Sequence, residues 1–237
     1  MPLVDRKHTV VPRSPLFRRD GLELEFALKN GLQTPIAALR ASIEGLASEL
    51  RGHRPQPAAI PGVLEEVEQL AVNVANLIDA ATPPDAYPLV CSVEEILQGA
   101  ASIASAPDRR RLLLAHPAAS QKIRVDGTLL VRLLRRLVEN ALEADGNEVL
   151  LLARIGDASV EFSVLNHSSV PVDADWAVAP FHSSKNNRLG LGLTAVHSDV
   201  AALGGTFEFE VCASGDVRAA VNVPLPPDGP EREELAA

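Results

Sequence analysis

Residues 131–144, VRLLRRLVENALEA, are followed by two further apolar runs, NEVLLLARI at 147–155 and ASVEFSVLN at 158–166. Apolar residues recur at helical spacing in the first stretch, so it predicts an amphipathic helix over about 127–144. The two later runs are rich in branched and aromatic residues and meet at Gly156 and Asp157, which predicts a β-hairpin. A helix that leads directly into a hairpin indicates a domain in which helices pack on a sheet.

The sequence on both sides of this stretch continues the alternation of helix and strand. Upstream, a helix is predicted over about 93–104, and short strands over RLLLAH at 111–116 and KIRVD at 122–126. Downstream, we expect a long loop over about 166–189, then a helix over 191–203 and two strands over 205–213 and 217–225. The expected fold of this part is an α/β sandwich, with a mixed sheet covered by helices on one face.

The first third of the chain has a different pattern, that of two helices with heptad seams. The seam residues are Leu32, Ile36, Leu39, Ile43, Leu46 and Leu50, then Val63, Val67, Leu70, Val74, Leu77 and Ala81. The Pro- and Gly-rich stretch 51–62 separates the two sets. Such a hairpin leaves much apolar surface uncovered, so we expect a second copy to complete a dimeric four-helix bundle.

Composition sets the domain boundaries and excludes several classes of function. We expect a flexible tail at 1–20, a dimerisation hairpin at 21–83, the sandwich domain at 86–226 and an acidic tail at 227–237. The chain has no run of eighteen apolar residues and no signal-peptide pattern, so we expect a cytoplasmic protein without a membrane partner. A net charge of −9 argues against direct binding of nucleic acid. Two distant cysteines predict buried free thiols.

Four motifs, in a constant order, resemble the core of two-component sensor histidine kinases. They are NGLQTPIAALRASIEGL at 30–46, VENALEAD at 138–145, PFHSSK at 180–185 and GLGLTAVHSDVAALGGTFEFE at 190–210. They are similar to the phosphoacceptor segment, the Asn-containing box, the Phe-containing box and the second glycine box of that family. The layout is also similar to dimeric histidine phosphotransferases that have a degenerate ATPase domain. The resemblance implies an ATPase domain of the histidine-kinase (Bergerat) type.

The same resemblance implies a set of nucleotide-binding residues. Asn140 matches the asparagine that binds the magnesium ion between the nucleotide phosphates, as a hard cation prefers oxygen ligands. Gly190 and Gly192 match the glycines whose backbone N–H groups meet phosphate oxygens. Lys185 lies in the preceding lid and would add a cation. Mg-ATP is therefore the cofactor that the resemblance implies. We expect the chain to keep the geometry of the family's nucleotide site more firmly than we expect it to bind a nucleotide.

Two positions that the family uses for phosphorylation carry other residues here. Matching Thr34 and Pro35 to the family's Thr-Pro places Asn30 at the phosphoacceptor histidine and Gly31 at the neighbouring acid. An asparagine amide has no basic lone pair for attack on a phosphate, and glycine has no carboxylate to accept a proton. We therefore do not expect an active histidine kinase.

The first glycine box of the family is also altered. Matching Val170 and Pro171 to the family's Ile-Pro places Leu165 at the aspartate that accepts the adenine amino hydrogen, with His167 and Ser169 at the glycines. An adenine amino group without its acceptor costs on the order of 1–3 kcal/mol, so we expect weak or absent ATP binding.

Three functional hypotheses remain open at the level of sequence. The first is a catalytically degenerate histidine-kinase-like protein, a dimeric pseudokinase that binds a response-regulator receiver domain or a partner kinase. The second is a phosphatase for receiver phospho-aspartate in which Thr34, four residues after Asn30 and on the same helical face, positions the water, with Gln33 as a further amide. The third is an ATP-dependent enzyme or switch that retains Asn140, Lys185 and the glycines.

A few other side chains have a structural and a functional interpretation. Arg132, Arg135 and Arg136, and the second cluster Arg109–Arg111, suit either phosphate or an acidic receiver, but solvated arginines paired with Glu139 and Glu143 are the commoner arrangement. Trp176, the only tryptophan, is expected either to fill a vacated adenine pocket or to pack in the core.

Overall fold

The computed structural model describes residues 6–10, 36–37, 40–41, 43–45, 59–81, 84–115, 121–144, 148–179 and 190–226. The chain divides into two compact units, one formed by residues 1–13, 83–178 and 196–237 and the other by residues 14–82 and 179–195. The described helices are α3 (Ala59–Ala81), α4 (Val93–Ala101), α5 (Gly127–Glu143), α6 (Ala174–Val178), α7 (Gly192–Ala202) and the 3₁₀ helix η3 (Asp108–Arg110). The described strands are β1 (Arg6–Val10), β2 (Leu89–Ser92), β3 (Leu112–Ala115), β4 (Lys122–Val125), β5 (Val149–Ile155), β6 (Ser159–His167), β7 (Thr206–Cys212) and β8 (Asp216–Pro224).

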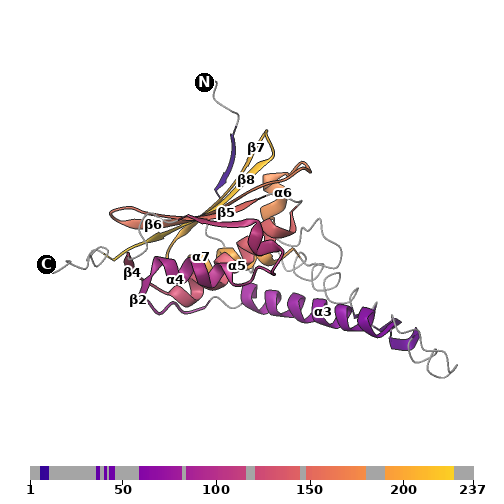
Figure 1. The fold of residues 1–237 in the computed structure, drawn as a ribbon. Helices are drawn as coiled ribbons and strands as arrows, with labels where there is room; N and C mark the ends of the chain where they lie inside the picture. Colours follow the sequence, from indigo (N-terminus) through magenta and orange to yellow (C-terminus); the bar gives the residue numbers. More distant parts are fainter. Residues whose placement is uncertain are drawn as a thin grey trace. The chain divides into compact units, whose positions relative to one another are not determined.

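The sandwich unit is built on a six-stranded sheet in the order β1-β7-β8-β6-β5-β3. Only β3 and β5 pair in parallel, and the other neighbours are antiparallel, so the sheet is mixed as expected. The helices α4, α5 and α7 lie along one face of this sheet (Figure 1). The predicted α/β sandwich is therefore confirmed.

The sequence of α5 explains both where the helix begins and which of its faces is buried. Asp126 is the N-cap, and its carboxylate accepts a hydrogen bond from the backbone N–H of Leu129 at 2.9 Å. The face toward the sheet is almost entirely aliphatic, and Leu130, Leu133 and Leu134 are fully buried. These residues pack with Phe162 of β6, which is also fully buried, so one amphipathic helix supplies much of the core.

The N-terminal segment differs from the prediction. Residues 6–10 were expected to belong to a flexible tail, but they form β1, which pairs antiparallel with β7 from Arg6 opposite Cys212 to Val10 opposite Glu208. That expectation is wrong for these residues. Five residues are too few to show the alternation of a strand. Their backbone hydrogen-bond partners lie on the edge of β7, far along the chain, and no local pattern indicates them.

A second, two-stranded sheet was also not predicted in full. The predicted strand over 122–126 is present as β4, but its partner is β2 at Leu89–Ser92, directly before α4. Ser92 ends the strand and begins the helix, because its hydroxyl accepts from the backbone N–H of Glu94 and the carboxylate of Glu95 accepts from the backbone N–H of Ser92. Four residues between a proline and a capping box left too short a pattern for prediction.

In the other unit, the helical hairpin is described only in part. Residues 36–37, 40–41 and 43–45 are helical, and α3 begins at Ala59, inside the stretch expected to interrupt the helices. Pro61 is compatible with this start because the first N–H groups of a helix need no partner within the helix. Several seam residues are exposed in the single chain: Ile36, Ile43, Val67 and Val74 are between 39% and 50% exposed. Among the helices of the described residues, none combines the length and the apolarity needed to cross a membrane.

The largely enclosed His197 is expected to make the stability of the sandwich unit depend on pH. His197 of α7 packs edge-on against Phe207 with ring centroids 4.9 Å apart, and burial lowers its pKa from 6.5 to about 4. Above pH 6.5 the ring is neutral in both states. As the pH falls from 6.5 toward 4, only the unfolded chain binds the proton, so we expect up to about 3 kcal/mol of stability to be lost over this window.

Urea unfolding of the wild type and His197→Gln at several pH values from 7.5 to 4 tests this expectation. Between pH 6.5 and 4, the free energy of unfolding of the variant should depend on pH less steeply than that of the wild type, by the uptake of one proton. Parallel curves for the two proteins in that window would contradict it.

Candidate functional site

The residues expected to carry the site fall into three groups. Asn30, Gly31, Gln33, Thr34 and Lys185 lie outside the described residues. Asn140 belongs to the sandwich unit, while Gly190 and Gly192 group with residues 179–195 in the other unit.

Asn140 lies near the end of α5, on the same side of the helix as two arginines. Arg132, Arg136 and Asn140 follow each other at intervals of four residues, which places them in one row along the helix. Asn140 is half-buried, whereas its neighbour Glu139 is exposed and Ala141 is buried. Its amide oxygen is thus held on a rigid helix and is of the chemical type that a magnesium ion accepts.

Gly190 and Gly192 shape the start of α7. Gly190 has φ = 65°, a left-handed conformation that strains any other residue. The first bond of the helix runs from the N–H of Ala195 to the carbonyl of Leu191, and the buried side chain of Leu191 has no hydrogen-bonding group. Leu191 therefore supplies no side-chain cap to the first turn, and the N–H groups at the start of a helix are suited to binding an anion.

The register of β6 changes the assignment at the first glycine box. Val160, Phe162 and Val164 are buried on the face covered by helices, so Asn166 is on that face and Leu165 is on the opposite one. The cross-strand pairs agree, because Asn166 lies opposite buried Val217 and Leu165 lies opposite Arg218. The residue of this pair on the helix-covered face is therefore Asn166, so the match of Leu165 to the family's aspartate does not agree with the register of β6.

The side chains at the end of β6 fold back on the neighbouring hairpin. His167 Nδ1 lies 3.1 Å from Asp216 Oδ1, and Ser214 Oγ donates to Asp216 Oδ2 at 2.7 Å. The hydrogen bond from Ser214, then that from His167, lowers the pKa of Asp216. The adjacent Gly215 has φ = 89°, and a Cβ there would lie 2.6 Å from the carbonyl oxygen of Ser168. This end of the sheet is thus closed by its own polar contacts.

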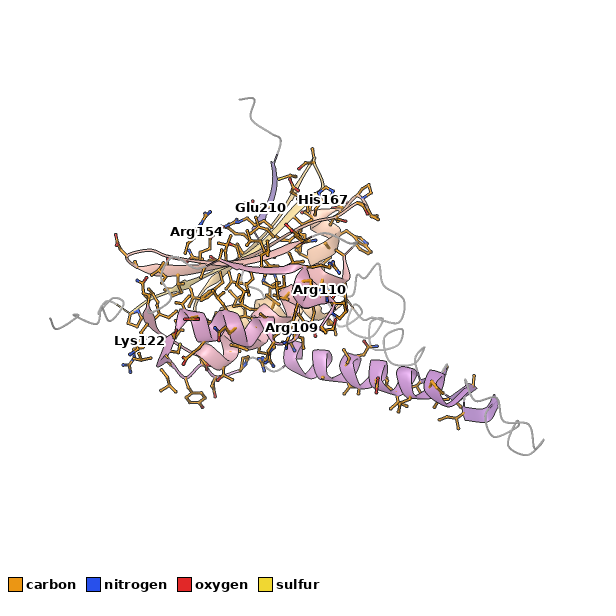
Figure 2. The ribbon with its side chains drawn as sticks, in the orientation of Figure 1. Arg109, Arg110, Lys122, Arg154, His167 and Glu210 are labelled. Atoms are coloured by element: carbon orange, nitrogen blue, oxygen red, sulfur yellow. The ribbon has the colours of Figure 1, made fainter. Side chains whose placement is uncertain are left out.

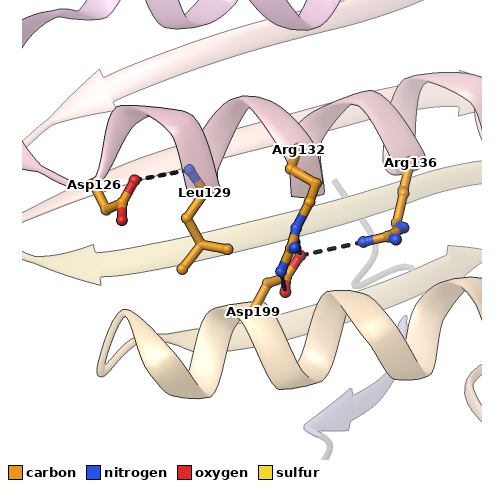
Figure 3. A network of polar contacts seen from close by, with 5 residues as sticks. All are labelled: Asp126, Leu129, Arg132, Arg136 and Asp199. Carbon is orange, nitrogen blue, oxygen red and sulfur yellow. Dashed lines mark hydrogen bonds and ion pairs between the residues drawn. The ribbon is translucent and has the colours of Figure 1, made fainter. Parts of the chain in front are cut away.

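A buried ion cluster joins α5 to α7 (Figure 3). Asp199 is fully buried, and its carboxylate binds both Arg132 and Arg136, with Arg136 Nη1 at 3.3 Å from Oδ2. The side chain of Arg132 is 38% exposed and that of Arg136 only 15%. The two guanidinium groups outnumber the single carboxylate, so these three residues carry a formal charge of +1.

The expectation of solvated arginines is therefore wrong for the α5 cluster. Arg132 and Arg136 bind the buried acid, and Arg135 donates from Nε to the carbonyl of Gly99 at 3.0 Å and from Nη2 to Ser102 Oγ at 2.8 Å. They connect three helices, which helical spacing along α5 alone could not show. One signal was present in the sequence, because Asp199 stands between Val196 and Val200 at a position where the helical period requires an apolar residue.

In the second arginine cluster, Arg109 and Arg110 are exposed, as expected for solvated arginines, whereas the tryptophan differs from expectation. Arg109 donates to the carbonyl of Ala104 at 3.2 Å, and Arg111 lies 3.3 Å from both Asp108 Oδ1 and the carbonyl oxygen of Leu142. These two arginines fasten the turn around η3 rather than forming an open basic patch, and Figure 2 shows Arg109 and Arg110 on the side of the helices. Trp176 of α6 is 42% exposed, so the expectation of core packing is wrong.

Comparisons with known proteins agree with this architecture. No protein-family model matches the sequence, and no curated protein matches it significantly. Solved structures do match. The histidine kinase AdeS of Acinetobacter baumannii is 18% identical with a TM-score of 0.65, over 83% of this chain and 98% of that one. The catalytic domain of histidine kinase ThkA is 20% identical with a TM-score of 0.53, over 60% of this chain and 98% of that one.

A third structure holds a complex. The histidine kinase ThkA with the response regulator protein TrrA is similar at 18% identity and a TM-score of 0.68, over 89% of this chain and 63% of that one. Identities at this level show the fold alone. Together with the mixed sheet, the helices on one face and the hairpin helix α3, they show that this chain has the fold of a histidine-kinase core.

Proposed function

We propose that this chain is a catalytically degenerate histidine-kinase-like protein of two-component signal transduction, which dimerises and binds a response-regulator receiver domain or a partner kinase. The observation that carries the proposal is the histidine-kinase fold combined with asparagine at position 30 and glycine at position 31. A fold that docks receivers but lacks the nucleophile is suited to binding rather than phosphorylation. The complex of the similar kinase ThkA with TrrA supports a receiver as the partner class.

Two features of the sandwich unit support degeneracy. His167, which the sequence match places at one of the family's glycines, contacts Asp216 at the end of β6. Asn166 replaces an aspartate on the helix-covered face, so one acceptor oxygen remains but the negative charge is gone. These changes weaken nucleotide binding. Asn140 and the first turn of α7 are the parts that a nucleotide would still use.

The experiment mixes the purified chain with a panel of receiver domains, with and without phosphorylation by acetyl phosphate, and measures binding by fluorescence anisotropy. At least one receiver should bind, and radiolabelled ATP with Mg²⁺ should label neither protein. Asn30→Arg should weaken binding at least tenfold, whereas Arg154→Glu, on the exposed outer face of the sheet, should not. Failure of every receiver and every kinase of the cell to bind would overturn the proposal.

The same mixtures distinguish the alternative activities. If Thr34→Ala slows the decay of a phosphorylated receiver, the phosphatase hypothesis gains over pure binding; equal rates remove it. Calorimetry with millimolar Mg-ATP should give no heat, and a measurable heat that Asn140→Ala abolishes would favour an ATP-dependent function instead.

The dimer has a matched test on α3. Val74 lies on the apolar seam and is 39% exposed, while the next residue, Ala75, is exposed and lies off the seam. A second copy is the natural cover for a seam that also exposes Ile43 and Val67. Val74→Glu should shift the dimer dissociation constant upward by at least tenfold in analytical ultracentrifugation, and Ala75→Glu should leave it within about threefold. Equal effects of the two variants would reject this seam.

A further inference from the structure

The edge of the sheet beyond β7 is occupied by a segment from the beginning of the chain. β1 pairs with five of the seven residues of β7, from Glu208 to Cys212. The short helix α6 touches both β1 and β7. An edge strand of alternating aromatic and acidic residues, TFEFEVC, would otherwise present a row of unpaired backbone groups to any extended chain.

The outer face next to this edge is acidic. Arg218 of β8 is surrounded by three carboxylates, with Glu161 Oε2 at 2.9 Å, Glu208 Oε2 at 3.3 Å and Glu210 Oε1 at 3.4 Å. These four residues come from three neighbouring strands and have a formal charge of −2. Figure 2 shows Glu210 on the side of the sheet away from α4 and α5.

Glu210 shows how closely this edge is covered. It lies on the outer face, yet it is only 7% exposed. In the register of the sheet it stands between Arg218 of β8 and His8 of β1, so the two flanking strands enclose it. A carboxylate this deeply buried is stabilised by positive charge on both sides, so Glu210 favours a basic residue on the β1 side as well as Arg218 on the β8 side.

The segment that occupies the edge has the matching charge. Residues 6–10 read RKHTV, and in the register with β7 the positions of Arg6 and His8 belong to the same face as Glu210, whereas the position of Lys7 belongs to the opposite face, beside Val211. Backbone pairing supplies affinity for any extended chain, and the acidic face supplies preference for a basic one.

We infer that the outer edge of β7 is a strand-binding surface selective for basic extended segments, and that residues 6–10 are its internal ligand. The segment therefore acts as a removable cover: while it is paired, the edge is closed, and when it leaves, the same edge accepts a basic strand from another chain. This surface is the edge of the six-stranded sheet beside the short helix α6, and the inference does not rest on the proposed receiver binding.

The first test uses a variant that lacks residues 1–13 and a fluorescent peptide of residues 2–13, PLVDRKHTVVPR. In the intact chain the internal strand competes at an effective concentration on the order of millimolar, so the peptide should bind the shortened variant at least tenfold more tightly than the intact chain. A peptide with Arg6 and His8 changed to glutamate is the control and should bind at least tenfold more weakly. Raising the salt concentration should weaken the natural peptide only. Equal binding of the peptide to the shortened and intact chains would overturn the inference.

The second test keeps the chain at full length and does not depend on the truncated variant folding. In an antiparallel pair, alternate residues of β1 direct their N–H groups toward β7 or away from it. One of the variants His8→Pro and Thr9→Pro should therefore break the ladder, and the other should be tolerated on the free edge. Hydrogen exchange of the β7 amides over 208–212 should accelerate at least tenfold in one variant only. No acceleration in either variant would show that β1 does not close the edge.

One further outcome identifies the source of the strand. If the rate at which the peptide replaces residues 6–10 depends on the concentration of the intact protein, the strand that covers β7 comes from a second copy. The Val74→Glu variant, in which the α3 seam is disrupted, distinguishes this strand exchange from dimerisation through the seam. If receiver binding fails while the peptide binds, the inference about β7 stands and the proposed function falls.

Discussion

Asp199→Ala is expected to lower the free energy of unfolding by about 3–5 kcal/mol. The carboxylate is fully buried and is shared by Arg132 of one turn of α5 and Arg136 of the next. Its removal takes the buried carboxylate away from both guanidinium groups, and Arg136 is too enclosed to turn to water, with a side chain only 15% exposed. Unfolding in urea, followed by circular dichroism, measures the change.

Two control variants separate charge from packing at Asp199. Asp199→Asn keeps the shape and one acceptor oxygen, so it should lose less than the alanine variant. The combined change Asp199→Leu, Arg132→Met and Arg136→Met replaces the whole cluster by apolar side chains and should recover most of the loss, since buried ion clusters often exchange for apolar groups without penalty. A loss below about 1 kcal/mol in Asp199→Ala would show that the cluster is not a structural tie.

Gly205→Ala is expected to lower the free energy of unfolding by about 3 kcal/mol, near the upper end for overpacking. A Cβ at this position would overlap the carbonyl oxygen of Asn222, a backbone atom of β8 that cannot move without displacing the strand. The Gly205 N–H also donates to the carbonyl of Val200 at 2.9 Å and so ends α7. The same urea measurement detects the loss.

The neighbouring glycine is the matched control. Gly204 has φ = 68°, and a Cβ there would meet only Pro224 Cγ at 3.8 Å, which is ordinary contact. Gly204→Ala should therefore lower the free energy of unfolding by only about 1–2 kcal/mol, because alanine is strained in the left-handed conformation. If the two alanine variants lose the same stability, the close approach of β8 does not decide the requirement for glycine at 205.

Periodic segments could be predicted because their pattern is local. The helix α5 and the hairpin of β5 and β6 follow from spacing alone, and Gly156 closes the turn, with its N–H donating to the carbonyl of Ser159 at 2.8 Å. The second glycine box was informative in the same way, because two of its glycines, Gly190 and Gly204, adopt the positive φ angles that favour glycine. In such segments, local chemistry and the final fold agree.

The features that escaped prediction all depend on partners far along the chain. β1 pairs with a strand that begins at Thr206, and Asp199 finds its arginines in α5. The shift from Leu165 to Asn166 needed the buried side of β6, which only the packed sheet supplies. The hydrophobic period says which residues are buried, but it does not say which polar residue on a buried face has found a partner.

The pairing of β1 with β7 also sets an order of events during synthesis. Val10 and Glu208 are adjacent in the sheet but almost two hundred positions apart in the chain, so the ribosome makes one long before the other. At roughly 5–20 residues per second, the interval is on the order of ten seconds or more. The first-made strand must therefore wait for the last sheet edge to appear, and its docking closes a long loop late in folding. A nascent chain arrested before Thr206 should carry residues 6–10 in a protease-accessible form.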